Sequence, residues 1–245
     1  PSKDQSYFLC QTTQKQLAKA LFPIGNLLKS EVRAIASKIN LITADKKDSQ
    51  GLCFVGKIKL PEFLQQQLKS IEGPVIEIPE GLSQFIDYKN LTNDTSHIEE
   101  LCKPFTYKKS DGIEVSKHAG AHFYTIGQRK GLHIGGRPQP SFVIATNTEE
   151  NIVYSGQTDA HPGLNRIALK IESGSQNWIS RHNEHEEIDY DFRIRYRQSL
   201  QKGKLVQKNG SYYVLFHNKQ KGISPGQFVA WYEKDVLVGS GVIEN

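Results

Sequence analysis

The stretch that decides the fold is "GKLVQKNGSYYVLFH", residues 203–217. Two runs rich in β-branched and aromatic residues flank Asn209-Gly210, a pair that favours a tight β-hairpin turn because both residues tolerate positive φ. A second hairpin is predicted near Lys234 and Asp235, between the runs "GQFVAWY" and "DVLVGSGVI". The last part of the chain is therefore predicted to be antiparallel sheet.

Strand patterns continue upstream of these hairpins. In "DYDFRIRYRQ", residues 189–198, apolar residues alternate with Asp191, Arg193, Arg195 and Arg197, which is typical of a half-buried strand with a charged face. The runs "HFYTI", "SFVIAT", "NIVYSG" and "IALKIES" also indicate strands. So many short strands at this spacing favour a small β-barrel.

The first seventy residues have helical patterns instead. "TTQKQLAKALF" carries Thr13 and Gln16 at capping-box spacing, and "KSEVRAIASKIN" offers Ser30 as an N-cap and Asn40 as a stop. "LPEFLQQQLKS", residues 60–70, has the apolar spacing of a third helix. By contrast, the polar segment 86–117 is predicted to be a long loop with little regular structure.

These patterns predict an α+β chain. We expect residues 1–20 to be the tail of an N-terminal domain, residues 21–72 a small, mostly helical central domain, and residues 73–245 an antiparallel β-barrel. The 245 residues include no Met, even at position 1, and open on "PSKDQSYFL". We therefore expect them to be part of a longer polypeptide.

Composition narrows the class of protein. Charged residues make up 23% and apolar residues 37% of the chain, as in globular proteins. No apolar run approaches the ~20 residues of a membrane span, and no signal peptide is present, so we predict a cytoplasmic protein without a membrane partner. The net charge of +5 is compatible with a solvated surface or with a basic face for RNA.

The cysteine in "DKKDSQGLCFVG", residues 45–56, has two interpretations. Cys53 is a small apolar residue of a short buried strand, or its sulfur is presented by a flexible loop. A reactive thiol needs nearby positive charge and access to its partner, and Lys46, Lys47 and the glycines of the loop would supply both. The residues alone leave both interpretations open.

Three other groups of residues are candidate binding sites. "YTIGQRKGLHIGG", residues 124–136, is a phosphate-holding loop presenting Arg129 and Lys130, or a tight turn with solvated basic residues. Arg193, Arg195 and Arg197 would share one strand face, either toward RNA or toward solvent. The histidines of "SRHNEHEE" lack a third metal ligand and indicate a solvated loop.

Taken together, the motifs resemble those of the bacterial-type tRNA-specific 2-thiouridylases, a family that places sulfur on the wobble uridine of certain tRNAs. The resemblance runs in family order along nearly the whole chain. It is carried by "KDQSYFL", "LFPIGNLLKSEVRAIA", "ADKKDSQGLCFVG", "YTIGQRKGLHIGG", "HPGL", "RYRQ" and "SPGQFVAWY".

The resemblance implies an enzyme with an N-terminal α/β ATP-binding domain of the PP-loop type, a central domain and a C-terminal β-barrel. In that family ATP, with Mg2+, adenylates the uracil 2-carbonyl, and a cysteine persulfide supplied by a sulfur-relay donor protein delivers the sulfur. The match makes Cys53 the persulfide carrier. It implies tRNA contacts by Lys3, Asp4, Gln5, Arg195, Tyr196 and Gln227.

The sequence departs from the family in two ways. The PP-loop motif S-G-G-x-D-S does not occur, and neither does the upstream cysteine that pairs with the persulfide carrier and helps to release the sulfur. The chain alone is therefore expected to be inactive. A binding module or split subunit that needs a separate ATP-binding partner is the main alternative, and a sulfur relay through Cys53 without RNA is a weaker one.

Overall fold

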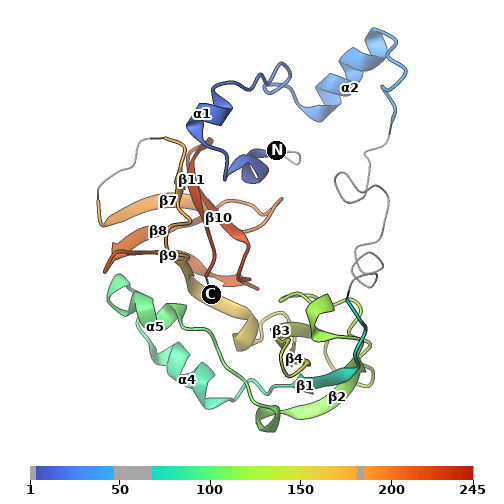
Figure 1. Cartoon of the computed structure of the whole chain (residues 1–245), viewed down its shortest axis with the longest axis vertical. Helices are drawn as coiled ribbons and strands as arrows, with labels where there is room; N and C mark the ends of the chain where they lie inside the picture. The colour runs from blue at the N-terminus through green and yellow to red at the C-terminus, as the bar shows by residue number, and fades with distance from the viewer. Residues whose placement is uncertain (1–3, 47–67, 181–184, 245) are drawn as a thin grey trace.

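A computed structural model describes residues 4–46, 68–180 and 185–244, and two β-sheets form its body (Figure 1). In the smaller sheet the strand order is β2-β1-β4-β3, with β1 and β4 parallel and the other pairs antiparallel. Its strands are β1 (Gly73–Glu77), β2 (Ile113–His118), β3 (Ser141–Asn147) and β4 (Ile152–Gln157).

The larger sheet is antiparallel throughout and has the strand order β5-β9-β8-β7-β10-β11-β6. Both predicted hairpins are confirmed: Asn209 and Gly210 have φ of 51° and 74°, and Lys234 has φ of 55°. The strands are β5 (Asn165–Ile171), β6 (Asn177–Trp178), β7 (Glu187–Arg193), β8 (Gln201–Lys208), β9 (Ser211–Lys221), β10 (Phe228–Glu233) and β11 (Val236–Val242).

The predicted barrel is not closed. Beyond β11 the chain meets β5 at a single bridge, Ile171 to Ile243, flanked by hydrogen bonds from Glu172 N to Val242 O at 2.9 Å and from Glu244 N to Lys170 O at 3.0 Å. The short strand β6 pairs with the edge of β11 that β10 leaves free. No continuous ladder therefore joins β11 to β5. The range 73–245, predicted as one barrel, thus contains two sheets, and the larger one encloses a core around Trp231 and Phe192.

The segment 86–117, predicted to be a loop, contains regular structure. Helices α4 (Ser83–Asn90) and α5 (Ile98–Cys102) and the turn η2 (Thr95–His97) precede strand β2, and α5 packs on β5 and β9 (Figure 1). Such short helices gain little from intrinsic propensity, and burial against the sheet stabilises them. Ile98 and Leu101 are fully buried there, which a polar local sequence does not reveal.

Three further one-turn helices connect these elements: η3 (Lys109–Asp111), η4 (Ala121–Phe123) and η5 (Pro162–Leu164). The turn η4 stands where "HFYTI" predicts a strand, so that prediction is wrong. The backbone is instead fixed by hydrogen bonds from Phe123 N to Gly120 O and from Ala121 N to the Asn151 side chain, of 3.1 and 2.9 Å.

The N-terminal segment, with η1 (Ser6–Leu9) and α1 (Gln14–Leu17), packs on the larger sheet beside β10 and β11 (Figure 1). The carbonyl of Cys10 accepts hydrogen bonds from Asn177 Nδ2 at 2.8 Å and from Ser240 Oγ at 2.6 Å. The capping box of Thr13 and Gln16 is confirmed, although the helix that it starts has a single turn.

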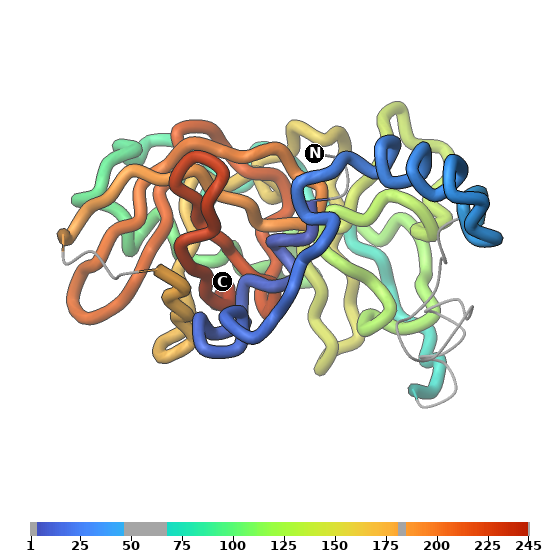
Figure 2. The backbone as a smooth tube through the Cα atoms, turned by 90° about the horizontal axis from the view of Figure 1, so that it is seen from above, coloured from blue at the N-terminus to red at the C-terminus, as the bar shows by residue number. Residues whose placement is uncertain are grey.

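The mostly helical central domain is not supported. Between residues 21 and 46 the one helix is α2 (Lys29–Lys38), which ends before Asn40 (φ 53°) as predicted. Its cap is Leu28 rather than Ser30, because the Glu31 carboxylate accepts the Leu28 N–H at 2.5 Å. None of its residues is buried, and Figure 1 shows it standing clear of both sheets. Seen from above in Figure 2, it projects over the side of the molecule that holds the smaller sheet.

Most of the third predicted helix, and Cys53 itself, lie outside the described residues. Leu68 to Ser70, the described end of that pattern, are not helical. Across the parts of the chain that the structure describes, no helix is both long and apolar enough to span a bilayer.

Candidate nucleic-acid interface

Tyr7 connects the N-terminal segment to two segments that are far away in the sequence, those around Ile194 and Phe228. Its ring is buried, with 8% of the residue exposed, in a cluster with residues of β10. The phenol donates hydrogen bonds to Phe228 O at 2.9 Å and to Ile194 O at 3.2 Å. Arg195 and Gln227 directly neighbour the residues of these two carbonyls, and Gln5 lies two residues before Tyr7, so the predicted RNA-contacting stretches lie around one buried side chain.

Asp4 is held in place by neighbouring groups. Its carboxylate accepts hydrogen bonds from Ser6 N at 2.9 Å and from Arg193 Nη1 at 2.8 Å. Partial burial acts to raise the pKa of Asp4, but the bonds from Ser6 and Arg193 outweigh it and hold the pKa below its usual value. Gln5 is exposed, and its carbonyl accepts a hydrogen bond from Phe8 N at 3.0 Å. Lys3 lies outside the described residues.

The three arginines do not share one strand face, contrary to the prediction. Strand β7 ends at Arg193, whose guanidinium pairs with Asp4 and lies 5.4 Å from the Tyr232 ring centroid. After Arg193 the chain leaves the sheet and turns at Arg197, which has φ of 68°. Pairing of β7 with β10 stops at Arg193, which is why the side-chain alternation predicted beyond it is lost.

Arg195 is half-buried and stabilises the turn after β9 through hydrogen bonds. Its Nη2 donates to the carbonyls of Lys221 and Gly222. Burial lowers the pKa of this guanidinium, although arginine stays charged at any ordinary pH. Gly222 has φ of 61°, where a side chain is strained, and a Cβ there would lie 2.7 Å from Arg195 Nη2 and displace the guanidinium. One nitrogen makes both bonds, so the side chain keeps further N–H donors.

Tyr196 and Gln227 complete the predicted set. The Tyr196 ring is half-buried, and its centroid lies 4.4 Å from that of Phe8. Gln227 occupies the turn between β9 and β10, where its carbonyl accepts Ile243 N at 2.7 Å and its N–H bonds Ser224 O at 3.3 Å. Its side chain makes no hydrogen bond within the described parts of the chain.

The glycine-rich segment 124–136 forms a tight turn. Gln128 closes it through hydrogen bonds from its Nε2 to Lys130 O at 2.8 Å and from Thr125 N to its Oε1 at 3.2 Å. Arg129 and Lys130 are exposed. A Cβ on Gly222 would be 3.5 Å from Ile126 O, so this turn adjoins the Arg195 contact, a juxtaposition that the sequence did not predict.

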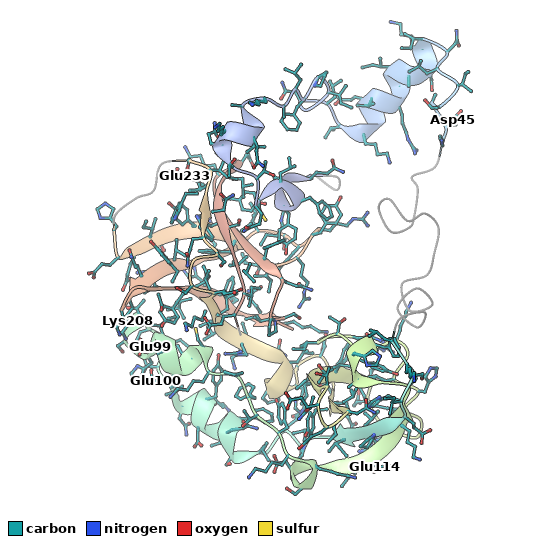
Figure 3. All side chains as sticks on the ribbon, viewed as in Figure 1. Asp45, Glu99, Glu100, Glu114, Lys208 and Glu233 are labelled. Carbon is teal, nitrogen blue, oxygen red and sulfur yellow. The ribbon has the colours of Figure 1, made fainter. Side chains whose placement is uncertain are left out.

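The lysines of β8 do not extend this interface. Lys202 pairs with Asp191 and Lys204 with Glu187, each at 3.0 Å across the β7–β8 ladder. At the hairpin end, Lys208 Nζ donates to Ser96 O at 3.0 Å, and Figure 3 shows Lys208 beside Glu99 and Glu100. The positive charges of Lys202 and Lys204 on this face of the sheet are therefore neutralised by carboxylates.

A cavity of about 430 Å³ adjoins the Gly222 turn and is lined by residues of both sheets, among them Tyr107, Ile144, Arg166 and Ser224. Its charged side chain, Arg166, is buried and donates to the carbonyls of Leu101, Cys102 and Lys103 at the end of α5. The cation therefore stabilises a helix terminus, as is common at helix C-termini.

The two described cysteines are unsuited to sulfur chemistry. Cys10 and Cys102 each expose 1% of their surface. Burial raises the pKa of the Cys10 thiol and raises that of Cys102 to about 12, so both thiols stay protonated and unreactive. Within residues 4–46, 68–180 and 185–244 no group of three His, Cys, Asp or Glu side chains could hold a metal ion.

Three family models match the chain in succession. The tRNA methyl transferase HUP domain matches residues 1–57, the tRNA methyl transferase PRC-barrel domain residues 103–157, and the aminomethyltransferase beta-barrel domain residues 169–243. The last two matches fall on the smaller and the larger sheet respectively.

Curated relatives are similar along the whole chain. The tRNA-specific 2-thiouridylase MnmA of Christiangramia forsetii is 52% identical over 246 residues, which cover 99% of this chain and 62% of the relative. That of Flavobacterium johnsoniae is 49% identical with the same coverage, and that of Halalkalibacterium halodurans is 39% identical over all of this chain and 57% of the relative. The chain thus spans about three fifths of the length of these relatives.

Proposed function

Because this chain belongs to the tRNA-specific 2-thiouridylase family, we propose that it is the tRNA-holding and sulfur-presenting part of an enzyme that thiolates the wobble uridine of tRNA. The observation that carries this proposal is the gathering of Asp4, Gln5, Arg195, Tyr196 and Gln227 around Tyr7. Those positions, with Lys3, form the proposed tRNA contact.

Two of these residues have a double role. Arg195 places the 221–222 turn through one nitrogen and offers its other N–H donors to a phosphate or base. Hydrogen bonds from Ser6 and Arg193 hold the pKa of Asp4 below its usual value, so it stays ionised, and its carboxylate orders the start of η1, which Gln5 caps. Gln5 and Gln227 carry both amide donors and acceptors, which suits hydrogen bonding to base edges.

Cys53 is the proposed sulfur carrier. The exclusion of Cys10 and Cys102 as buried thiols supports this assignment, since Cys53 is the third of the three cysteines. In the proposed transfer, the terminal sulfur of a Cys53 persulfide forms a bond to C2 of the uridine while the S–S bond breaks. A sulfur-relay protein would load the persulfide, and an upstream cysteine thiol would supply the two electrons by forming a disulfide with Cys53.

ATP, with Mg2+, would supply activation of the uracil 2-oxygen as a leaving group. The described residues do not fit an ATP site: the one glycine-rich turn, 124–136, is closed by Gln128 on its own backbone, and no acidic cluster is present among them. We therefore derive no step through ATP from this chain. An inactive tRNA-binding module, which would need a separate ATP-binding partner, is the second candidate, favoured by the same misfit.

The test of the sulfur carrier is Cys53→Ser in the complete enzyme. We expect the variant to bind tRNA as tightly as the parent and to form no 2-thiouridine, measured by nucleoside mass spectrometry after reaction with a sulfur donor and ATP. Cys102→Ser, at a buried thiol, is the matched control and should retain thiolation. Normal thiolation by Cys53→Ser would refute the assignment, whereas an inactive parent that binds tRNA would favour the binding module.

A further inference from the structure

We propose that Phe8, Tyr196 and Arg197 form a stacking platform for an unpaired base of the bound RNA. This aromatic platform rests on the proposed function, because it assumes that the ligand is RNA. It adds Phe8 and Arg197 to the interface and assigns them a nucleobase as their occupant.

Phe8 is a large aromatic side chain exposed at the surface. It lies in η1 with 63% of its surface exposed, directly after the buried Tyr7. Its ring centroid is 4.4 Å from that of Tyr196, with 45° between the planes. Tyr196 packs in turn against the cluster of Tyr7 and Tyr232. Phe8 is thus supported on one side by a fixed ring and open on the other.

Arg197 adds a cation to this platform. Its guanidinium carbon lies 5.2 Å from the centroid of the Tyr196 ring, within the range of a cation–π contact. No acidic side chain of the described residues forms an ion pair with it, unlike Arg193, which Asp4 neutralises. Its φ of 68° is uncommon for a residue with a side chain, and it fixes the turn that presents the guanidinium.

An unpaired base fits this combination better than an apolar peptide does. Every base has a π-face that stacks on an aromatic ring, and its phosphate would meet the unneutralised guanidinium. The surroundings are polar, with Gln5 exposed beside Phe8 and the Arg195 donors next to Tyr196. Docking of an apolar protein segment on Phe8 is the competing outcome of the test.

The test measures binding of an unmodified tRNA transcript with uridine at the wobble position, titrated by fluorescence anisotropy at several salt concentrations. Phe8→Ala should weaken binding about 5- to 100-fold, the range for loss of one stacked base, without changing the salt slope. Phe8→Trp should restore binding, because stacking needs a ring rather than phenylalanine itself. Arg197→Asn, which tolerates positive φ, should lower the salt slope by about one neutralised phosphate.

Ile86→Ala is the matched control, since Ile86 is a large apolar side chain, 53% exposed, on α4, which lies at the opposite end of the molecule from η1 (Figure 1). It should bind like the parent. Equal binding by Phe8→Ala and the parent would overturn the platform and leave the proposed function standing. A parent chain without tRNA affinity would overturn both. A loss in Phe8→Ala that Phe8→Trp does not restore would show that the ring is not a stacking surface.

Discussion

At the scale of single residues, Tyr7 organises the interface, and its burial makes a prediction about pH. Burial, with a smaller contribution from Cys10, raises the pKa of Tyr7 from 10.0 to about 12. The phenol therefore holds its proton more tightly in the folded chain than in the unfolded chain. The stability that this provides is complete below about pH 10 and is lost as the pH rises toward about 12.

Tyr7→Phe should remove this pH-dependent stability and the hydrogen bonds of the phenol to Ile194 O and Phe228 O. We expect the free energy of unfolding to fall by about 1–2 kcal/mol at neutral pH, because a buried carbonyl loses its partner. Urea unfolding of the two proteins at neutral pH and in the alkaline range measures both effects. If the difference between them stays constant as the pH rises through this window, the assignment of the alkaline loss to Tyr7 is wrong.

At the scale of elements, the contact between the end of β7 and the turn after β9 depends on Gly222. Gly222→Ala combines strain at a φ of 61° with a Cβ only 2.7 Å from Arg195 Nη2. We expect a loss of about 2–4 kcal/mol in the free energy of unfolding, measured by chemical denaturation, and weaker tRNA binding because Arg195 is displaced.

The matched control is Gly174→Ala, where φ is 76° but nothing lies within 4 Å of the added Cβ. That variant should lose about 1–2 kcal/mol from backbone strain alone and bind tRNA normally. Equal losses in the two variants would show that the Arg195 contact contributes nothing beyond strain.

At the scale of the whole molecule, the distribution of charge predicts how tRNA binding responds to salt. The proposed interface carries three cations, Lys3, Arg195 and Arg197, whereas the lysines of β8 are paired with Asp191 and Glu187. Contact with about three phosphates gives a slope near −2 for log affinity against log salt, so a tenfold rise in salt weakens binding about 100-fold. Titration of the chain with tRNA across salt concentrations measures this slope.

Lys204→Gln should leave the slope unchanged, because Glu187 neutralises Lys204 at 3.0 Å in the free protein. A fall in the slope for this variant would place the RNA on the β7–β8 face instead. Affinity that is independent of salt would contradict a phosphate-binding interface altogether.

The sequence by itself determined the hairpins at Asn209-Gly210 and Lys234-Asp235, the capping box of Thr13 and Gln16, and the family. These features are local, since turn residues and caps act through their own backbone, and motifs are read in order along the chain. The division at residues 20 and 72, the cytoplasmic location and the role of Cys53 stay predictions.

Only the tertiary structure decided the rest. Helices α4 and α5 form because their apolar residues are buried, Phe85 and Tyr88 in α4 and Ile98 and Leu101 in α5. The barrel stays open because β6 pairs with an edge of β11. The arginine row is broken because β7 stops pairing at Arg193, so that Arg195 points to a turn that follows it by 26 residues. Contacts between segments so far apart depend on how the sheets pair and pack, which local patterns along the chain do not encode.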